Sequence, residues 1–227
     1  MRRGLLAGMV GFAALVLFAP AAPGATVTLG QVAPSGAFSN CGACSDLQRS
    51  TDPASPSYAV PPLPAGGAPW TMVSWSARGL SSGPGTARAL VWRPTGTAGE
   101  YRLVANTADG QFAADAIGTF MTSIPVQPGD VLGIRSGTSF DPLYDSVHSA
   151  DVEIGAMGDP VVGDTTGAPG STLPSESGSN LLLNISATLS APDPAVKRKC
   201  KKKKHKRSAQ SAKKKKCKKH KKKAARP

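Results

Sequence analysis

Apolar and polar residues alternate in several short runs, of which the most regular is IGTFMTSI at positions 117–124. A period of two indicates an extended strand, because successive side chains point to opposite faces. After it, Pro125 and Pro128 interrupt the ladder donors, Gly129 tolerates a positive φ, and Asp130 can bond the local backbone. The apolar run VLGIR follows directly. The pattern predicts two strands joined through a Pro-Gly turn.

Similar runs predict further strands, and no segment shows a sustained helical period with caps. In the segment WTMVSWSA, Val73, Trp75 and Ala77 are expected to share one face. Many short strands separated by Gly, Pro and Ser predict an all-β fold, an antiparallel β-sandwich that is jelly-roll-like. The further strands are expected at residues 26–31, 70–77, 86–92, 101–105, 150–154 and 180–189.

Three connections between these strands are long. Residues 51–69 contain six prolines and are predicted to form an extended surface connection. Residues 136–149 and 157–179 are predicted to be long loops, the second of them mobile or functional.

The N-terminal residues have the pattern of a secretory signal peptide. Arg2 and Arg3 precede the apolar run from Leu5 to Phe18, and small residues follow up to Gly24. As a helix the apolar run would rise about 21 Å, which is short of the roughly 30 Å hydrocarbon core of a bilayer. The predicted organisation is a signal peptide at 1–24, a β-sandwich domain at 25–192 and a basic tail at 193–227.

Charge is divided sharply between the last two segments. Residues 24–192 carry six Arg and thirteen Asp or Glu, a formal net charge of −7, whereas the residues from 193 onward carry nineteen Lys or Arg and one Asp, a net charge of +18. The overall formal charge of +13 therefore comes from the tail and not from the expected folded body.

The tail consists of two Lys-rich blocks, KRKCKKKKHKR and KKKKCKKHKKK, around the spacer SAQSA. Like charges at helical spacing oppose a helix and no apolar face exists to pack, so the tail is predicted to be disordered. Its charge density predicts polyanion binding, because each neutralised phosphate releases counterions. The predicted polyanion-binding residues are Lys197, Arg198, Lys199, Lys201, Lys202, Lys203, Lys204, Lys206, Arg207, Lys213, Lys214, Lys215, Lys216, Lys218, Lys219, Lys221, Lys222 and Lys223.

Export favours particular partners for such a tail. An anionic envelope polymer or a membrane surface is expected, since each Lys or Arg near an anionic membrane contributes about 1 kcal/mol. Nucleic acid is expected only as a non-specific partner. A solvated tail that serves solubility is the alternative.

Four cysteines are present, and in an oxidising compartment they predict disulfides. Cys41 and Cys44 are expected to staple a loop, with a redox-active pair or half of a metal site as alternatives. Cys200 and Cys217 are expected to close a loop within the tail or to pair between chains. A zinc site remains a weaker alternative, and its ligands would be Cys200, His205, Cys217 and His220.

The body offers few candidates for catalysis. His148 lies near four acids, but no G-x-S-x-G elbow accompanies it, so a surface histidine is expected and no catalytic residue or cofactor is predicted. The four acids could bind calcium, although they do not follow the D-x-D-x-D-G spacing. Asn184 begins an N-x-S acceptor inside an expected strand and is interpreted as structural. The acids are Asp141, Asp145, Asp151 and Glu153.

The aromatic residues could form a platform for stacking on sugars, and this makes carbohydrate a further candidate partner. Packing is the favoured role for the set, with Trp75 in the core, while Trp70 and Trp92 could serve either purpose. The aromatic set is Trp70, Trp75, Trp92, Tyr101 and Tyr144.

Seven features together resemble a group of exported β-sandwich proteins of high-GC actinobacteria that carry a Cys-containing, Lys-rich C-terminal tail. They are the signal segment, the C-G-x-C segment, VSWSARG, LVWRPTG, IPVQPGDVLGI, NLLLNISATL and the tail itself. The resemblance implies export and brings no catalytic residues. A more distant likeness to carbohydrate-binding jelly rolls concerns architecture alone.

The expected function is that of a non-enzymatic, envelope-associated exported protein whose tail binds an anionic surface. The alternatives are a carbohydrate-binding or adhesion module and, less favoured, a small hydrolase that uses His148.

Overall fold

The structure is a computed structural model. It describes residues 24–32, 38–39, 44–50, 54–80, 83–137, 139–145, 151–167, 171–173 and 175–192. Within these ranges every regular element is a strand, which confirms the all-β prediction. The strands are β1 Ala25–Gln31, β2 Phe38–Ser39, β3 Cys44–Ser50, β4 Trp70–Arg78, β5 Gly85–Pro94, β6 Tyr101–Asn106, β7 Gly110–Phe112, β8 Ile117–Val126, β9 Val131–Ser136, β10 Leu143–Asp145, β11 Asp151–Met157, β12 Thr165–Thr166, β13 Ser175–Ser179, β14 Leu181–Leu183 and β15 Ile185–Ala191.

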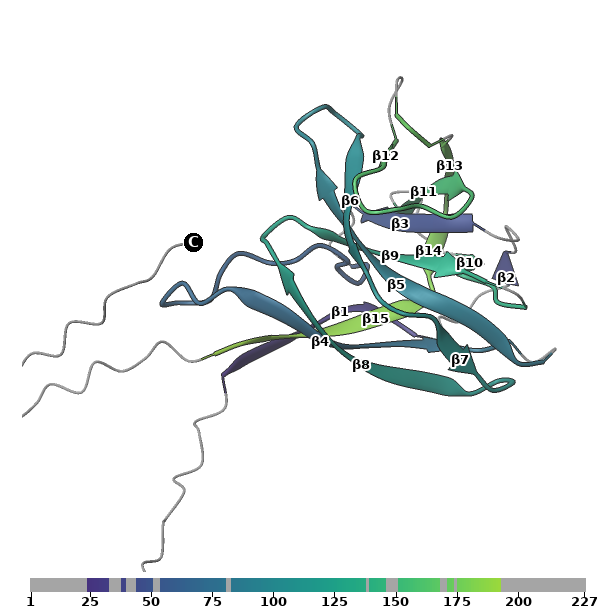
Figure 1. The fold of residues 1–227 in the computed structure, drawn as a ribbon, viewed down its shortest axis with the longest axis horizontal. Coiled ribbons are helices and arrows are strands. Elements are labelled where there is room, and N and C mark those ends of the chain that lie inside the picture. Colours follow the sequence, from purple (N-terminus) through teal and green to yellow (C-terminus); the bar gives the residue numbers. More distant parts are fainter. Residues whose placement is uncertain are drawn as a thin grey trace, which may run out of the picture. The chain divides into compact units, whose positions relative to one another are not determined.

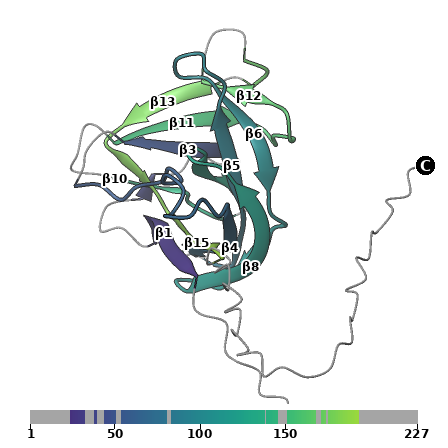
Figure 2. The same cartoon turned by 90° about the vertical axis from the view of Figure 1, so that its left-hand side faces the viewer.

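The strands form antiparallel sheets that pack as a sandwich (Figures 1 and 2). One sheet has the order β1-β15-β4-β8 and is called sheet A. The second, sheet C, has the order β12-β6-β5-β9-β3-β11-β13, with β7 pairing with β5. A small sheet of order β14-β10-β2 completes the set. The expected antiparallel β-sandwich is therefore present.

The core between the sheets is built from apolar residues at alternate strand positions. Trp75 of β4 is 1% exposed and stacks on Phe120 of β8, with ring centroids 4.8 Å apart. Phe112 of β7 meets Phe120 edge-on at 5.1 Å. Gly118 leaves room for this cluster, because a Cβ atom there would lie 2.9 Å from the Phe112 ring. Through these aromatic contacts β8 packs against β4 and β7.

The Pro-Gly turn lies where the sequence predicts it. Asp130 N donates to Gln127 O at 3.0 Å, and Gln127 N donates to Asp130 Oδ2 at 2.8 Å. Gly129 has φ of +86°, which a side chain would disfavour. The preceding strand is longer than expected, since Pro125 still pairs with Thr71. Strand β8 is at the edge of sheet A, where a proline is tolerated because the position of its missing N–H can face solvent.

The alternation predicted for residues 70–77 is wrong in its first half. Met72 is 1% exposed and Val73 is half-buried, while Trp75 and Ala77 are buried as expected. The register between β4 and β8 shifts between Met72 and Ser74. This β-bulge inserts one extra residue and reverses the phase of the side chains.

The single strand expected at 180–189 is two strands in two different sheets. Asn184 separates β14, which pairs with β10, from β15, which pairs with β1 and β4. Its side chain is fully buried and bonds the backbone of Arg78 at the end of β4, as a neighbouring strand would. Oδ1 accepts from Arg78 N at 3.1 Å, and Nδ2 donates to Arg78 O at 2.7 Å. Asn184 is thus structural, as predicted, but it ends a strand instead of lying within one.

Other expectations for the connections also need correction. Within residues 51–69, which were expected at the surface, Tyr58 and Val60 belong to the core. Tyr58 Oη donates to Leu183 O at 2.7 Å, and Ala59 forms a bridge with Val131. The two long loops contain strands as well, β10 in the first and β12 and β13 in the second. The segment that begins with the second cysteine of the early pair, Cys44–Ser50, forms β3, which the sequence did not predict.

Candidate functional site

Most of the predicted site residues lie outside the described residues. These are the eighteen basic residues from Lys197 to Lys223, together with Cys41, Cys200, Cys217, His148, His205 and His220. Cys44 is described, is 2% exposed at the start of β3 and is disulfide-bonded. Its sulfur lies 2.8 Å from Asp46 Oδ2, a contact without a proton because a disulfide sulfur carries none.

The aromatic residues do not form an exposed platform. Packing, the favoured role, is confirmed, and Trp70 and Trp92 are buried as well as Trp75. Trp70 Nε1 donates to Pro62 O at 3.2 Å, so its polar edge is used inside the fold. The five rings are at most 9% exposed, namely Trp70, Trp75, Trp92, Tyr101 and Tyr144.

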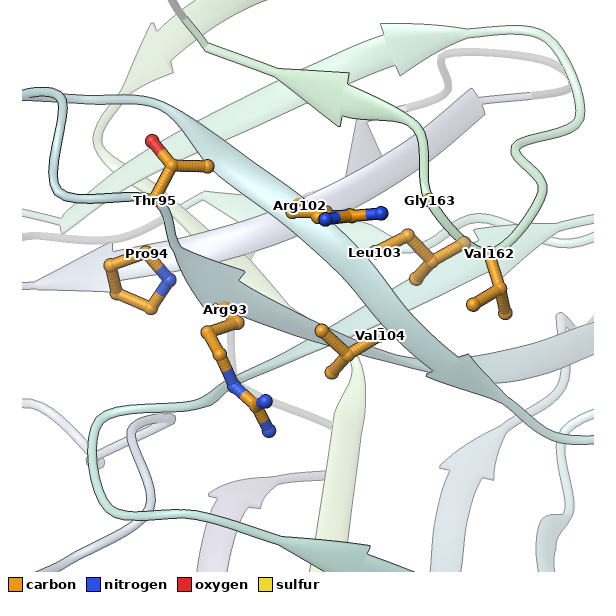
Figure 3. Close-up of a pocket in the computed structure, with 8 residues that line it drawn as sticks. All are labelled: Arg93, Pro94, Thr95, Arg102, Leu103, Val104, Val162 and Gly163. Carbon is orange, nitrogen blue, oxygen red and sulfur yellow. The ribbon is translucent and has the colours of Figure 1, made fainter.

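An open pocket lies where β5 ends beside β6 and the segment that precedes β12 (Figure 3). Its volume is about 470 Å³. In Figure 3 the two arginines come from neighbouring strands: the Arg102 side chain extends toward Gly163 and Val162, and the Arg93 side chain extends away from it, past the aliphatic Val104. The lining residues are Arg93, Pro94, Thr95, Arg102, Leu103, Val104, Val162 and Gly163.

Arg93 is held in place by the buried carboxylate of Asp130. Its Nε donates to Asp130 Oδ1 at 2.7 Å and its Nη2 to Oδ2 at 2.9 Å, a bidentate arrangement. Asp130 is 1% exposed, whereas the Arg93 side chain is 36% exposed. The hydrogen bonds with Asp130 raise the pKa of Arg93, although burial acts in the opposite direction. The turn that the sequence predicts is therefore also the anchor of a pocket arginine.

Arg102 lies directly opposite Arg93 in the ladder between β5 and β6. Opposed residues of an antiparallel pair project from one face with Cβ atoms about 4.5–5.5 Å apart, and like charges there are destabilising. Arg102 is exposed, and its side chain makes no ion pair or hydrogen bond within the described ranges. Of these two arginines, only Arg93 has a counter-ion among the described residues.

The far wall of the pocket is fixed by backbone bonds to β6. Gly163 N donates to Leu103 O at 2.9 Å, and Leu103 N donates to Asp164 O at 2.8 Å. The Asp164 carboxylate is occupied by Val161 N at 2.9 Å and by Thr172 Oγ1 at 3.4 Å. Val162 stands on this wall and is 58% exposed.

Sequence reasoning missed both arginines. A signal was present, because LVWRPTG and YRL flank a short Gly-containing connection, and closing that hairpin places Arg93 beside Arg102. The partnership of Arg93 with Asp130 had no such signal, since the two residues are separated by 37 positions.

Asp141, one of the acids weighed for calcium, is a buried carboxylate elsewhere in the fold. Asp141 is 9% exposed, and its Oδ1 has no hydrogen-bond partner among the described residues. Burial raises the pKa of this carboxyl group, and burial also raises the pKa of Tyr144 to about 12. Asp145 is described and exposed, while nothing is described of the side chains of Asp151 and Glu153.

In the part of the chain that the structure describes, no group of three or more His, Cys, Asp or Glu residues is arranged to hold a metal ion. The same residues include no helix that is both long enough and apolar enough to cross a bilayer.

Comparison with protein-family models, with curated proteins and with solved structures finds no match for this chain. Function is therefore inferred from the residues, contacts and charges of the chain itself.

Proposed function

We propose that this chain is an exported, non-enzymatic protein that its Lys-rich tail holds at an anionic envelope polymer or membrane surface. The observation that carries the proposal is the division of charge, −7 over residues 24–192 and +18 from residue 193 onward. A basic segment of this density attracts polyanions irrespective of fold. The net negative body is repelled by the same surface, so attraction is confined to the tail.

The choice of an envelope polymer or membrane as the partner of the tail depends on export. It is supported by the Arg pair, the apolar run and the small residues of positions 1–24, and by cysteines suited to disulfides. Outside the cytoplasm, the abundant polyanions are envelope polymers and lipid headgroups. In the proposal Cys41 pairs with Cys44 and Cys200 with Cys217.

The test is retention on isolated envelopes across a salt series. The full chain is compared with a chain that ends at residue 196 and with a full-length variant in which the eighteen basic residues of the tail become Gln. We expect retention of the full chain to fall steeply with salt, and both variants to be released at low salt. The Gln variant controls for length, since only charge differs. Equal retention of all three proteins at every ionic strength would overturn the proposal.

A carbohydrate-binding module that acts through the sandwich is the second candidate. The pocket at the end of β5 and β6 favours it, because this pocket is open and has both polar and apolar walls. Retention that survives loss of the tail charge and is competed by free sugar would favour this candidate over the first.

A further inference from the structure

We propose that the pocket between β5, β6 and residues 162–163 binds a small organic anion, with its carboxylate or phosphate group held by Arg102 and Arg93. Such a site is separate from the tail and goes beyond the tethering function. Both residues line the pocket, and the register places them opposite each other.

The first argument is uncompensated charge. The lining contains two arginines and no acid. Asp130 neutralises Arg93, and Arg102 has no partner within the described ranges. An oxyanion bound in the pocket would give Arg102 the counter-charge that Asp130 gives Arg93.

The second argument is preorganisation. A guanidinium group has five N–H donors, and Asp130 uses two of those on Arg93. The Asp130 carboxylate thus fixes the orientation of Arg93 and leaves its other donors unused among the described residues. Because Arg93 is already ordered, binding a ligand to it costs less side-chain entropy than binding to an arginine that the ligand must first order.

The third argument concerns the body of the ligand. A volume of about 470 Å³ exceeds what a bare oxyanion fills and lies in the range of small-molecule sites. Val104 and Val162 line the pocket beside the arginines, and 58% of Val162 is exposed without a ligand. A ring-sized apolar group that carries the anion would cover this surface.

The test uses the full chain, labelled with ¹⁵N, and three probes. Benzoate and phenyl phosphate carry the two oxyanions, and benzamide is the neutral counterpart of benzoate. We expect benzoate or phenyl phosphate to shift the amide signals of Thr95, Val104 and Gly163 saturably, with benzamide at least tenfold weaker, roughly the loss expected for one charged pair. The stronger of the two anions identifies the carboxylate or the phosphate as the natural group.

Two variants with the same change of charge test the assignment. Arg102→Gln is expected to raise Kd about tenfold or more, while Arg49→Gln, at an exposed position of β3, is expected to leave Kd within about twofold. Arg102→Lys retains the charge but not the planar fork, so an intermediate loss is expected. Unchanged amide signals elsewhere show that each variant is folded.

Three results would overturn the site. Probe-induced shifts could be confined to the lysines of the tail, Arg49→Gln could weaken binding as much as Arg102→Gln, or benzamide could bind as tightly as benzoate. A failure of this site is distinguishable from a failure of tethering, because both substituted arginines lie in the body and the retention assay changes only the tail.

Discussion

Asp130 and Asp141 are both buried carboxylates, but among the described residues only the first has partners that compensate its burial. Asp130 accepts three N–H bonds, two from Arg93 and one from Gln127. Asp141 Oδ1 accepts none from the described residues, and burial raises the pKa of this group. Burial of a charge is costly unless it is paired. Replacing the acid by a neutral residue should therefore have opposite effects on stability at the two positions.

The largest effect is expected for Asp130→Ala. The substitution removes three hydrogen bonds, leaves Arg93 without its counter-ion and frees the turn, so we expect the free energy of unfolding to fall by about 3 kcal/mol. Urea denaturation of the full chain measures this change. Asp109→Ala is the matched control, because its carboxylate is 59% exposed and lies 3.8 Å from Arg88. Equal losses for the two variants would contradict the special role of Asp130.

An increase in stability is expected for Asp141→Asn. The variant removes an uncompensated charge, and at pH 7 we expect it to be more stable by about 1 kcal/mol. Because the folded protein has the higher pKa at Asp141, folding favours the protonated form, and the parent gains stability as pH falls through that pKa.

The advantage of Asp141→Asn should therefore be complete above the folded pKa and vanish below the ordinary value of about 3.9. Parallel urea denaturation of parent and variant from pH 7 to pH 3 measures it. A variant that is less stable than the parent at pH 7 would show that Asp141 has a compensating partner.

The smallest effect is expected for Asp159→Asn. Asp159 pairs with Arg88 and, at 3.7 Å, with Arg135, but its side chain is 65% exposed. The two arginine side chains are only 17% and 14% exposed, but solvent and salt screen a pair whose carboxylate is exposed, so we expect a loss below about 1 kcal/mol that shrinks at 1 M salt. Thermal unfolding at low and high salt compares the two conditions. A loss near that of Asp130→Ala would mean that exposure does not separate the two kinds of pair.

The sequence predicted those parts of the fold that local chemistry determines. The turn at Pro128 and Gly129 follows from the backbone preferences of two residues, and the alternation in β8 follows from a period of two. The bulge at Val73 and the break at Asn184 were not predicted, because both depend on partner strands distant in sequence.

Strand β3 illustrates why buried polar residues defeat pattern analysis. Ser45, Asp46 and Gln48 are at most 2% exposed, and Gln48 bonds the backbone of Leu181 and Leu183. Because most residues of β3 are polar, its sequence pattern is typical of a loop. The pocket was missed for a related reason, since Arg93 and Arg102 become neighbours only when their hairpin closes.

The central place of β15 in sheet A governs when this domain can fold. Ile185–Ala191 is the last strand that the structure describes, yet it lies between β1 and β4 and pairs with both. Until β15 is available, β1 with Leu29 and β4 with Trp75 cannot be joined into one sheet. Sheet A can then form only after residues 185–191 have emerged, and a chain cut short before Ile185 would leave two unpaired strand edges open to association.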